Sequence, residues 1–289
     1  MKHIVMDCDN TLGVPNCDVD DGLALIYLLG CKQAKVHGIT TTYGNNQLDV
    51  VYQATKKLRD DVGRPDIIIK KGGSSPTYGN SEAADYLVEM AHKYPGELSI
   101  LATGSLTNLK EAYKKDADFF NQVKEIVLMG GITSPLIFQK KQMNELNFSC
   151  DPKAAYLTLT KGHHVSVITG NHCLKVLFTK NEYKKELADI HNPMACYIKK
   201  ETNDWFGYNE MDYGIDGFYN WDVTAAVYLM HPELFIDHHL KFQLSQADLR
   251  TGFLRMDLNG SHCIHTPEIK KSELFKQNIY EHWLCVPVN

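Results

Sequence analysis

The chain has 289 residues, of which 44% are hydrophobic, and a formal net charge of −5. This composition suffices for the core of one large α/β domain, which we expect to span residues 1–289. A negative net charge without a long basic run argues against nucleic acid or a membrane surface as partner. No apolar stretch approaches the roughly 20 residues that span a bilayer, and Met1-Lys2-His3 leads into a predicted strand rather than a signal peptide. We therefore expect a cytoplasmic protein.

The eight cysteines are scattered along the chain without a C-x-x-C pair. This spacing gives no indication of a zinc ribbon or of thiol redox chemistry. We expect most of them to be small buried hydrophobic residues in a reducing compartment, without disulfides.

In chain order, short apolar runs alternate with stretches whose apolar residues recur with a period near 3.6. The predicted strands are His3–Asp7, Val36–Thr42, Asp66–Ile69, Leu98–Thr103, Glu125–Met129 and Val165–Thr169. The predicted helices between them include Asp49–Leu58, Ala83–Ala91, Leu106–Tyr113 and Pro152–Leu159. This βαβ alternation predicts an α/β fold with a mostly parallel central sheet flanked by helices.

After about Thr169 the alternation loosens, which predicts a small C-terminal elaboration. We expect helices at His191–Gly207, Val223–Leu229 and Ile269–Trp283, an aromatic loop at Tyr208–Tyr219 and a β-hairpin within Phe242–Leu258.

Polar loops follow four of the predicted strands. They are Asp7 with Asp9, Thr42–Asn45, Thr103–Ser105 and Gly130-Gly131. Since ligands bind at the carboxyl ends of strands in such sheets, these loops are expected to share one pocket.

Five aspartates lie within fifteen residues behind the first strand: Asp7, Asp9, Asp18, Asp20 and Asp21. Like charges at this density repel one another, so a fold that brings them together needs a cation. Carboxylate oxygens are hard ligands that suit Ca²⁺ or Mg²⁺. The sequence therefore predicts a metal site near the N-terminus.

An ordered set of motifs resembles the calcium-dependent nucleoside N-ribohydrolases, over roughly residues 1–230. The motifs are Asp7-Cys8-Asp9, Asp20-Asp21-Gly22-Leu23-Ala24-Leu25, Gly38–Asn45, Ala102–Asn108, Val127–Gly131, Glu145-Leu146-Asn147, Asp151-Pro152 and Trp221-Asp222. Each motif alone is weak, but the set in this order is specific. The resemblance implies an open Rossmann-like sheet, hydrolysis of the N-glycosidic bond of ribonucleosides, and a homodimer or homotetramer.

The resemblance also implies a metal set. Ca²⁺ would be held by Asp9, Asp21, the Thr103 carbonyl and Asp222, and would acidify and orient a water molecule. Asp9 would then take the proton of that water.

The same resemblance assigns residues to the sugar. Asp20 would accept a hydrogen bond from the 2′-hydroxyl, and Asn45, Glu145, Asn147 and Asp222 would bind the other hydroxyls. Such bonds strengthen as positive charge develops on the ribose ring.

The residue before Asp222 is a tryptophan, where many members of the family have a histidine. Trp221 resembles the purine-preferring branch, in which an aromatic ring stacks on the leaving base and favours its protonated form. Tyr213, Phe218 and Tyr219 would complete an aromatic slot. A modified base and pyrimidines stay open.

One departure concerns the loop between Asp9 and Asp20, which is longer than in the family. If the loop bulges outward, both ends keep their positions, because Gly13 and Pro15 supply turn chemistry. If it does not, Asp18 competes for the roles of base and ligand.

Two other functions remain open at this stage. Asp7-Cys8-Asp9-Asn10-Thr11-Leu12 also resembles the haloacid-dehalogenase-type phosphotransferases, in which Asp7 would be the nucleophile, Asp9 the acid and base, and Mg²⁺ the cofactor. The acidic pair that this family needs after a later strand is replaced by Gly130-Gly131. The third function is a non-catalytic binder of ribose or nucleosides.

Ordinary structural roles compete with each assignment. Asp20 and Asp21 are typical helix caps. Asn45 after Gly44 is a typical turn residue. Trp221, taken alone, is more often part of a core than of a binding site.

Overall fold

The computed structural model describes residues 1–288, so Asn289, the last residue of the expected domain, lies outside the described residues. A nine-stranded sheet forms the centre, in the order β13-β12-β14-β8-β5-β4-β1-β2-β3. The strands are β1 (Lys2–Cys8), β2 (Ala34–Thr41), β3 (Ile68–Lys71), β4 (Leu98–Ala102), β5 (Glu125–Met129), β8 (Val165–Ile168), β12 (His239–Gln243), β13 (Arg255–Met256) and β14 (His262–His265).

From β14 to β3, every strand runs parallel to its neighbours. β12 is antiparallel to both β14 and β13 at one edge. The mostly parallel sheet predicted from the βαβ alternation is therefore confirmed. All six predicted strands are present, with ends that shift by at most two residues.

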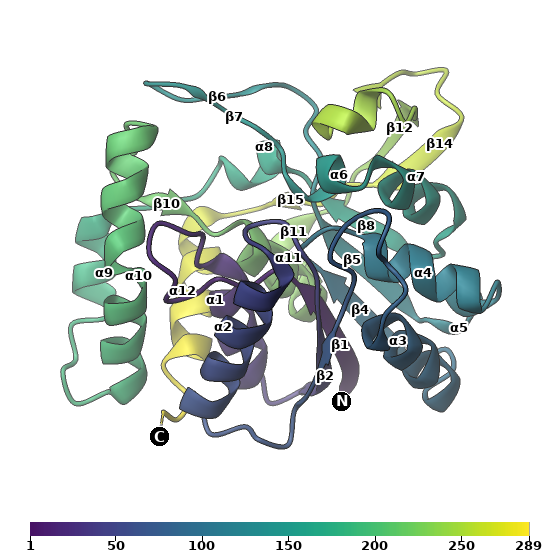
Figure 1. Ribbon diagram of the computed structural model, residues 1–289. Helices are drawn as coiled ribbons and strands as arrows, with labels where there is room; N and C mark the ends of the chain where they lie inside the picture. Colours follow the sequence, from purple (N-terminus) through teal and green to yellow (C-terminus); the bar gives the residue numbers. More distant parts are fainter. Residues whose placement is uncertain (289) are drawn as a thin grey trace.

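Helices cover both faces of the sheet (Figure 1). In β1, Ile4, Met6 and Cys8 belong to one buried cluster and Val5 to the other, because successive side chains of a strand point to opposite faces. The first face packs against α1 (Asp20–Gly30), α2 (Leu48–Asp61), α10 (Pro193–Asp212), α11 (Trp221–Met230) and α12 (Ser272–Trp283). The second face packs against α3 (Glu82–Lys93), α4 (Thr107–Lys115), α5 (Phe119–Gln122) and α7 (Pro152–Lys161).

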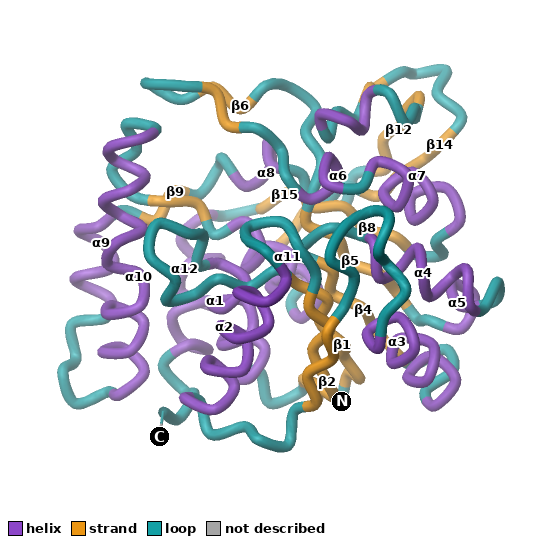
Figure 2. The backbone as a smooth tube through the Cα atoms, viewed as in Figure 1, coloured by secondary structure: helices purple, strands orange, loops and turns teal. Residues whose placement is uncertain are grey.

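Shorter elements complete the fold. They are α6 (Asn147–Cys150), α8 (Gly170–Cys173), α9 (Lys180–Glu186), β6 (Leu136–Ile137), β7 (Gln142–Met143), β9 (Leu177–Phe178), β10 (Phe218–Tyr219), β11 (Phe235–Ile236), β15 (Glu268–Ile269) and the 3₁₀ helices η1 (Pro232–Leu234) and η2 (Asp248–Thr251). Figure 2 shows the hairpin of β6 and β7 as a long arm at the edge of the molecule.

The C-terminal part differs from the prediction at three points. α10 continues to Asp212, so the first five residues of the predicted loop Tyr208–Tyr219 are helical. Gly207 does not stop the helix; Gly214 does, since its φ of +74° is the left-handed conformation that ends helices. Ile269 belongs to β15 rather than to the last helix. The predicted hairpin forms between β12 and β13, but η2 lies in its loop.

Within residues 1–288, no helix combines the length and the apolar character that crossing a membrane requires. All eight cysteines carry free thiols.

Candidate active site

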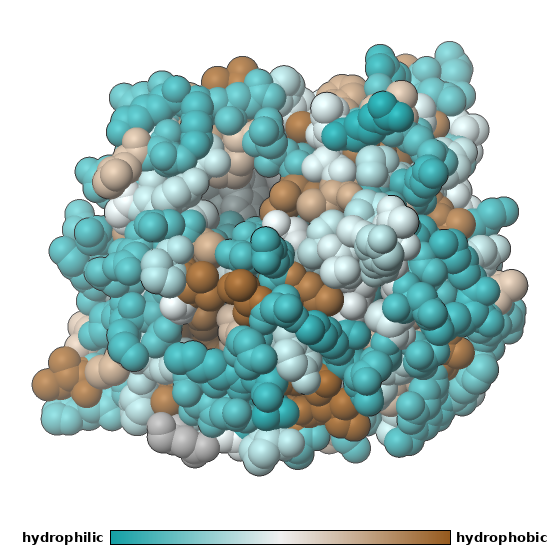
Figure 3. All heavy atoms as spheres, viewed as in Figure 1, coloured by the Kyte–Doolittle hydropathy of each residue, from teal (hydrophilic) through white to brown (hydrophobic). Residues whose placement is uncertain are grey.

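The order of the strands reverses between β1 and β4, because β2 and β3 lie on one side of this pair and β5 on the other. Asp9 follows β1 and Thr103 follows β4. The crevice at such a switch point is where open α/β sheets bind ligands. A cavity of about 500 Å³ opens there, and Figure 3 shows a hollow on this side of the molecule.

Segments outside the sheet build the cavity walls. They are the loop between β1 and α1, the β6–β7 hairpin, the end of α10 and the start of α11. The hairpin is tied to α10, because Lys140 Nζ donates to the carbonyl oxygens of Glu210 (2.8 Å) and Met211 (2.9 Å). Lys141, which lines the cavity, also pairs with Asp212. The hairpin and α10 therefore form one continuous wall.

Three buried carboxylates meet beside the cavity; Asp20 and Asp222 line it, whereas Asp21 does not. Asp20 and Asp21 occupy the first turn of α1, and Asp222 occupies the first turn of α11. One carboxylate oxygen from each lies within 4.8 Å of the others. The two helices pack against each other, and the backbone N–H of Asp222 donates to Asp20 Oδ2 at 2.9 Å. Neither aspartate of α1 caps the helix, because Val19 is the cap residue.

Asp9 lies beside this cluster and is fully buried. The backbone N–H of Asn45 donates to Asp9 Oδ2 at 2.6 Å, and the side-chain amide of Asn45 reaches Asp9 Oδ1 at 3.5 Å and Asp21 Oδ2 at 3.4 Å. A Cβ atom at Gly44 would overlap Asp9 Oδ2, so only glycine allows this approach. Burial raises the pKa of Asp9 to about 6.

Thr103 links the carboxylate cluster to Asn147. Its hydroxyl donates to Asp21 Oδ1 at 2.7 Å, and its carbonyl oxygen accepts from the amide of Asn147 at 2.8 Å. The structure thus brings Asp9, Asp21, Thr103 and Asp222 together. It also places Asp20, expected to bind the sugar, within the carboxylate cluster.

The donors of this cluster fit a hard divalent cation. Burial raises the pKa of Asp20, Asp21 and Asp222 above the usual range, and repulsion among the carboxylates adds to this for Asp21 and Asp222. Among residues 1–288, no Lys or Arg contributes to the raised pKa of these three aspartates. Buried carboxylates of this kind are stable when a cation compensates them, and carboxylate and carbonyl oxygens are the ligands of Ca²⁺.

Glu145 and Asn147 line the cavity and also hold its framework. The Glu145 carboxylate accepts from the backbone N–H groups of Gly131 (3.0 Å), Phe148 (2.8 Å) and Ser149 (2.9 Å). The side-chain nitrogen of Asn147 donates to the carbonyl oxygen of Thr103, which follows β4, and to that of Met129, the last residue of β5. Asn147 therefore has its Oδ1 left for a ligand, whereas Glu145 is largely engaged within the protein.

Aromatic rings form the wall above the carboxylates. Trp205, Tyr208, Tyr213 and Trp221 line the cavity. Trp205 and Tyr208 are stacked with ring centroids 4.9 Å apart, and Trp221 lies 5.1 Å from Tyr219. The rings present an apolar surface large enough for a heterocyclic base.

The expected aromatic slot is only partly correct. Tyr213 lines the cavity, whereas Tyr219 does not, and Phe218 is buried in the core, where its ring centroid lies 4.8 Å from that of Phe206. Alternation along β10 sends Phe218 and Tyr219 to opposite sides. The sequence prediction places Tyr208 in a loop and does not include it in the slot. Its position three residues after Trp205, on the same face of a helix, would have indicated that both rings line the cavity.

The middle of the longer loop between Asp9 and Asp20 is exposed at Gly13, Pro15 and Asn16, whereas Asp18 at its end lines the cavity next to Asp20. The Asn10 side chain accepts from the N–H of Leu12 at 3.1 Å, and the Thr11 hydroxyl donates to the carbonyl of Asp18 at 2.6 Å. Gly13 has a φ of +84°, as expected of a turn glycine. The loop adds Asn16, Cys17 and Asp18 to the cavity wall.

Asp7, the nucleophile of the phosphotransferase alternative, lies outside the cavity. Its Oδ1 accepts from Thr40 Oγ1 at 2.5 Å and from Asn108 Nδ2 at 2.7 Å, and the side chain is fully buried. Burial raises its pKa to about 7. Asp9 does not line the cavity either, but its partner Asn45 does, whereas Thr40 and Asn108 do not; Asp7 is therefore the less accessible of the two aspartates to a substrate.

A parallel sheet with a carboxylate-rich crevice at its switch point defines a class of α/β enzymes that act on small polar substrates. Comparison with known proteins gives the family. The model of the inosine-uridine preferring nucleoside hydrolases matches residues 4–273, and the chain belongs to this family. Its members hydrolyse the N-glycosidic bonds of nucleosides. The family membership inferred from the motifs is therefore confirmed.

Similar proteins come from several kingdoms. The "Probable uridine nucleosidase 2" of Oryza sativa subsp. japonica is 29% identical, over 83% of this chain and 79% of that protein. The "Uridine nucleosidase 1" of Arabidopsis thaliana is 27% identical, over 92% and 82%. Among solved structures, a purine-preferring ribonucleoside hydrolase from Gardnerella vaginalis superposes with a TM-score of 0.84 at 22% identity, over 98% of both chains.

Proposed function

We propose that this enzyme hydrolyses purine ribonucleosides to ribose and free base, with Ca²⁺ as its metal ion and Asp9 as general base. One observation carries the proposal. The buried carboxylates of Asp20, Asp21 and Asp222 converge beneath a wall of aromatic rings, and Asn45 links Asp9 to Asp21.

Asp9, Asp21, Asp222 and the carbonyl of Thr103 would hold the cation, and the position of Asp20 adds it to this set. When bound, the cation would lower the pKa of a coordinated water molecule and orient it. The carboxylates neutralise the charge of the ion and fix its position.

Asp9 would remove the proton from the attacking water. The two bonds from Asn45 hold its carboxylate in one orientation, which a general base requires.

The polar residues of the floor would bind the ribose. The transition state resembles an oxocarbenium ion, so its positive charge develops next to the carboxylates of Asp20 and Asp222. Asn45 and Asn147 supply amide groups beside them. These groups bind the transition state more strongly than the ground state, which is how binding energy accelerates a reaction.

Trp221 would stack on the departing base. It begins α11 directly before Asp222, and both residues line the cavity. An aromatic face attracts a protonated base, which helps the base to leave without a formal acid. Trp205, Tyr208 and Tyr213 extend the apolar wall, and this area favours the larger purine ring.

A release assay tests the proposal. Ribose is measured from inosine, guanosine, adenosine, uridine and cytidine, with Ca²⁺ and with a chelator. We expect release that depends on metal and is fastest with purines. Faster release from uridine, the base in the names of the two plant relatives, would overturn the base preference. Nucleoside binding without release would indicate a binding protein, and phosphate release from a phosphomonoester would indicate a phosphatase.

A further inference from the structure

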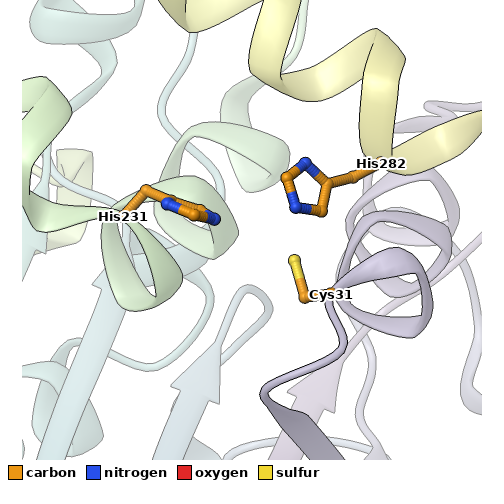
Figure 4. Close-up of side chains that lie close together, drawn as sticks. All are labelled: Cys31, His231 and His282. Carbon is orange, nitrogen blue, oxygen red and sulfur yellow. The ribbon is translucent and has the colours of Figure 1, made fainter.

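A second group of metal-binding side chains lies away from the cavity. Cys31, His231 and His282 each offer one ligand atom, and these atoms lie within 4.8 Å of one another. Figure 4 shows the three side chains converging from separate segments. Cys31 directly follows α1, His231 directly follows α11, and His282 is in the last turn of α12.

Both imidazole rings are already oriented by a neighbour. His231 Nδ1 lies 2.8 Å from Glu233 Oε1, and His282 Nδ1 lies 2.7 Å from the carbonyl oxygen of Asn278. These contacts fix the tautomer with the proton on Nδ1 and leave Nε2 for an ion. A carboxylate or carbonyl on the far nitrogen is the usual support of metal-binding histidines.

We propose that Cys31, His231 and His282 bind a borderline-soft transition metal ion, with Zn²⁺ as the best fit. Thiolate sulfur and imidazole nitrogen are both ligands of Zn²⁺, whereas the carboxylates of the active site suit Ca²⁺. The ligand atoms of a tetrahedral zinc site lie roughly 3.5 Å apart, so small side-chain rotations would close the cluster around an ion. Water would take the fourth position.

The cluster would join the ends of three helices, although the water in its fourth position distinguishes it from the closed four-ligand sites of purely structural zinc. α1 and α11 carry Asp21 and Asp222 in their first turns, and the cluster lies at their opposite ends. The ion would join these ends to α12. The helices already approach closely there, since a Cβ atom at Gly30 would overlap the carbonyl oxygen of His282. A clamp at this point would hold the two helices that position the carboxylates.

Metal binding must displace a proton from Cys31. Burial raises the pKa of this thiol to about 12, and only the thiolate is a ligand.

Cobalt spectroscopy on the full-length protein tests the site. Co²⁺ is added in the presence of excess Ca²⁺, which occupies hard carboxylate sites. We expect one Co²⁺ per chain with a thiolate-to-cobalt charge-transfer band, and loss of the band when Zn²⁺ is added. Cys31→Ser should remove the band. Cys285→Ser is the matched control, because this exposed thiol lies three residues after His282 and outside the cluster.

Zinc affinity measured by calorimetry gives an independent readout. Glu233→Gln, which alters the support of His231, should weaken binding by about 10–100-fold, and His231→Ala should weaken it more. The His231 variant also serves if Cys31→Ser does not fold, because the His231 side chain is 21% exposed whereas Cys31 is buried. Absence of a thiolate band in the wild type, loss of the band in Cys285→Ser, or unchanged zinc affinity in His231→Ala would each overturn the proposal.

Discussion

Asn45 binds Asp9 through both its backbone and its side chain, with the N–H donating to Oδ2 at 2.6 Å and the amide reaching Oδ1 at 3.5 Å. The same amide reaches Asp21 Oδ2 at 3.4 Å. Asn45, predicted from the sequence to bind a sugar hydroxyl, is thus also placed to orient the proposed base against the carboxylate cluster.

The first prediction concerns Asp9. Asp9→Asn keeps the size of the side chain but removes the base, so turnover should fall by about 10²–10⁴-fold while nucleoside affinity is retained. Ribose release and equilibrium binding measure the two effects. Asp18→Asn is the matched control, since Asp18 lies in the cavity wall of the extra loop; a loss confined to this control would make Asp18 the base.

The second prediction concerns the 2′-hydroxyl. Asp20 and Asn45 are proposed to face the ribose, so a 2′-deoxyribonucleoside would leave a buried polar group unpaired, at a cost of about 1–3 kcal/mol. We expect kcat/KM for deoxyinosine to lie below that for inosine by roughly 5–150-fold, as this cost implies. Equal values for the two substrates would remove Asp20 from this role.

The strands were predictable because buried parallel strands are short apolar runs with distinct ends. Because the end of the first apolar run is distinct, the aspartates that follow β1 could be placed at the carboxyl end of this strand. The length of α10 was not predictable, because Gly207 and Gly214 are the same residue type and only the backbone conformation of Gly214 ends the helix. A glycine with open space around it, like Gly207, is tolerated within a helix.

The floor of the site could be predicted, but its walls could not. Asp9, Asp21 and Asp222 lie in short motifs that can be recognised in the sequence without knowledge of the fold. Contacts such as that of Lys140 with the end of α10 join segments about 70 residues apart, and no local pattern encodes them. The inward direction of Phe218 likewise depends on its pairing with β9.

The third prediction concerns Trp221. Trp221→Ala should slow purine nucleosides by about 2–30-fold, which corresponds to the roughly 0.5–2 kcal/mol of a cation–π contact. Nitrophenyl riboside should be affected considerably less, because its leaving group needs no protonation. Both substrates are measured on the same variant. Equal losses would show that Trp221 only packs the pocket, and a loss as large as that of Asp9→Asn would show that it also positions Asp222.

The last prediction concerns pH and metal removal. The pKa of Asp9 is raised to about 6 and that of Asp7 to about 7, both above the ordinary value of 3.8. A raised pKa means that the folded state binds protons more tightly than the unfolded state. Their contribution to stability is therefore complete below about pH 4 and is lost as the pH rises through about 6 to 7. The metal-free protein should lose stability across this range.

Calcium should offset this loss, so the increase in Tm on adding Ca²⁺ should be larger at pH 8 than at pH 5. A metal concentration 100 times the Kd contributes about 2.7 kcal/mol, which corresponds to roughly 4–5 °C for a chain of this length. Asp7→Asn separates the two carboxylates, because Asp7 lies outside the cavity and its Oδ2 has no hydrogen-bond partner in the described chain. We expect this variant to raise the Tm of the metal-free protein at pH 8, to leave the calcium effect in place and to retain turnover. A calcium effect independent of pH would show that the carboxylates of the floor are not the groups that the ion compensates.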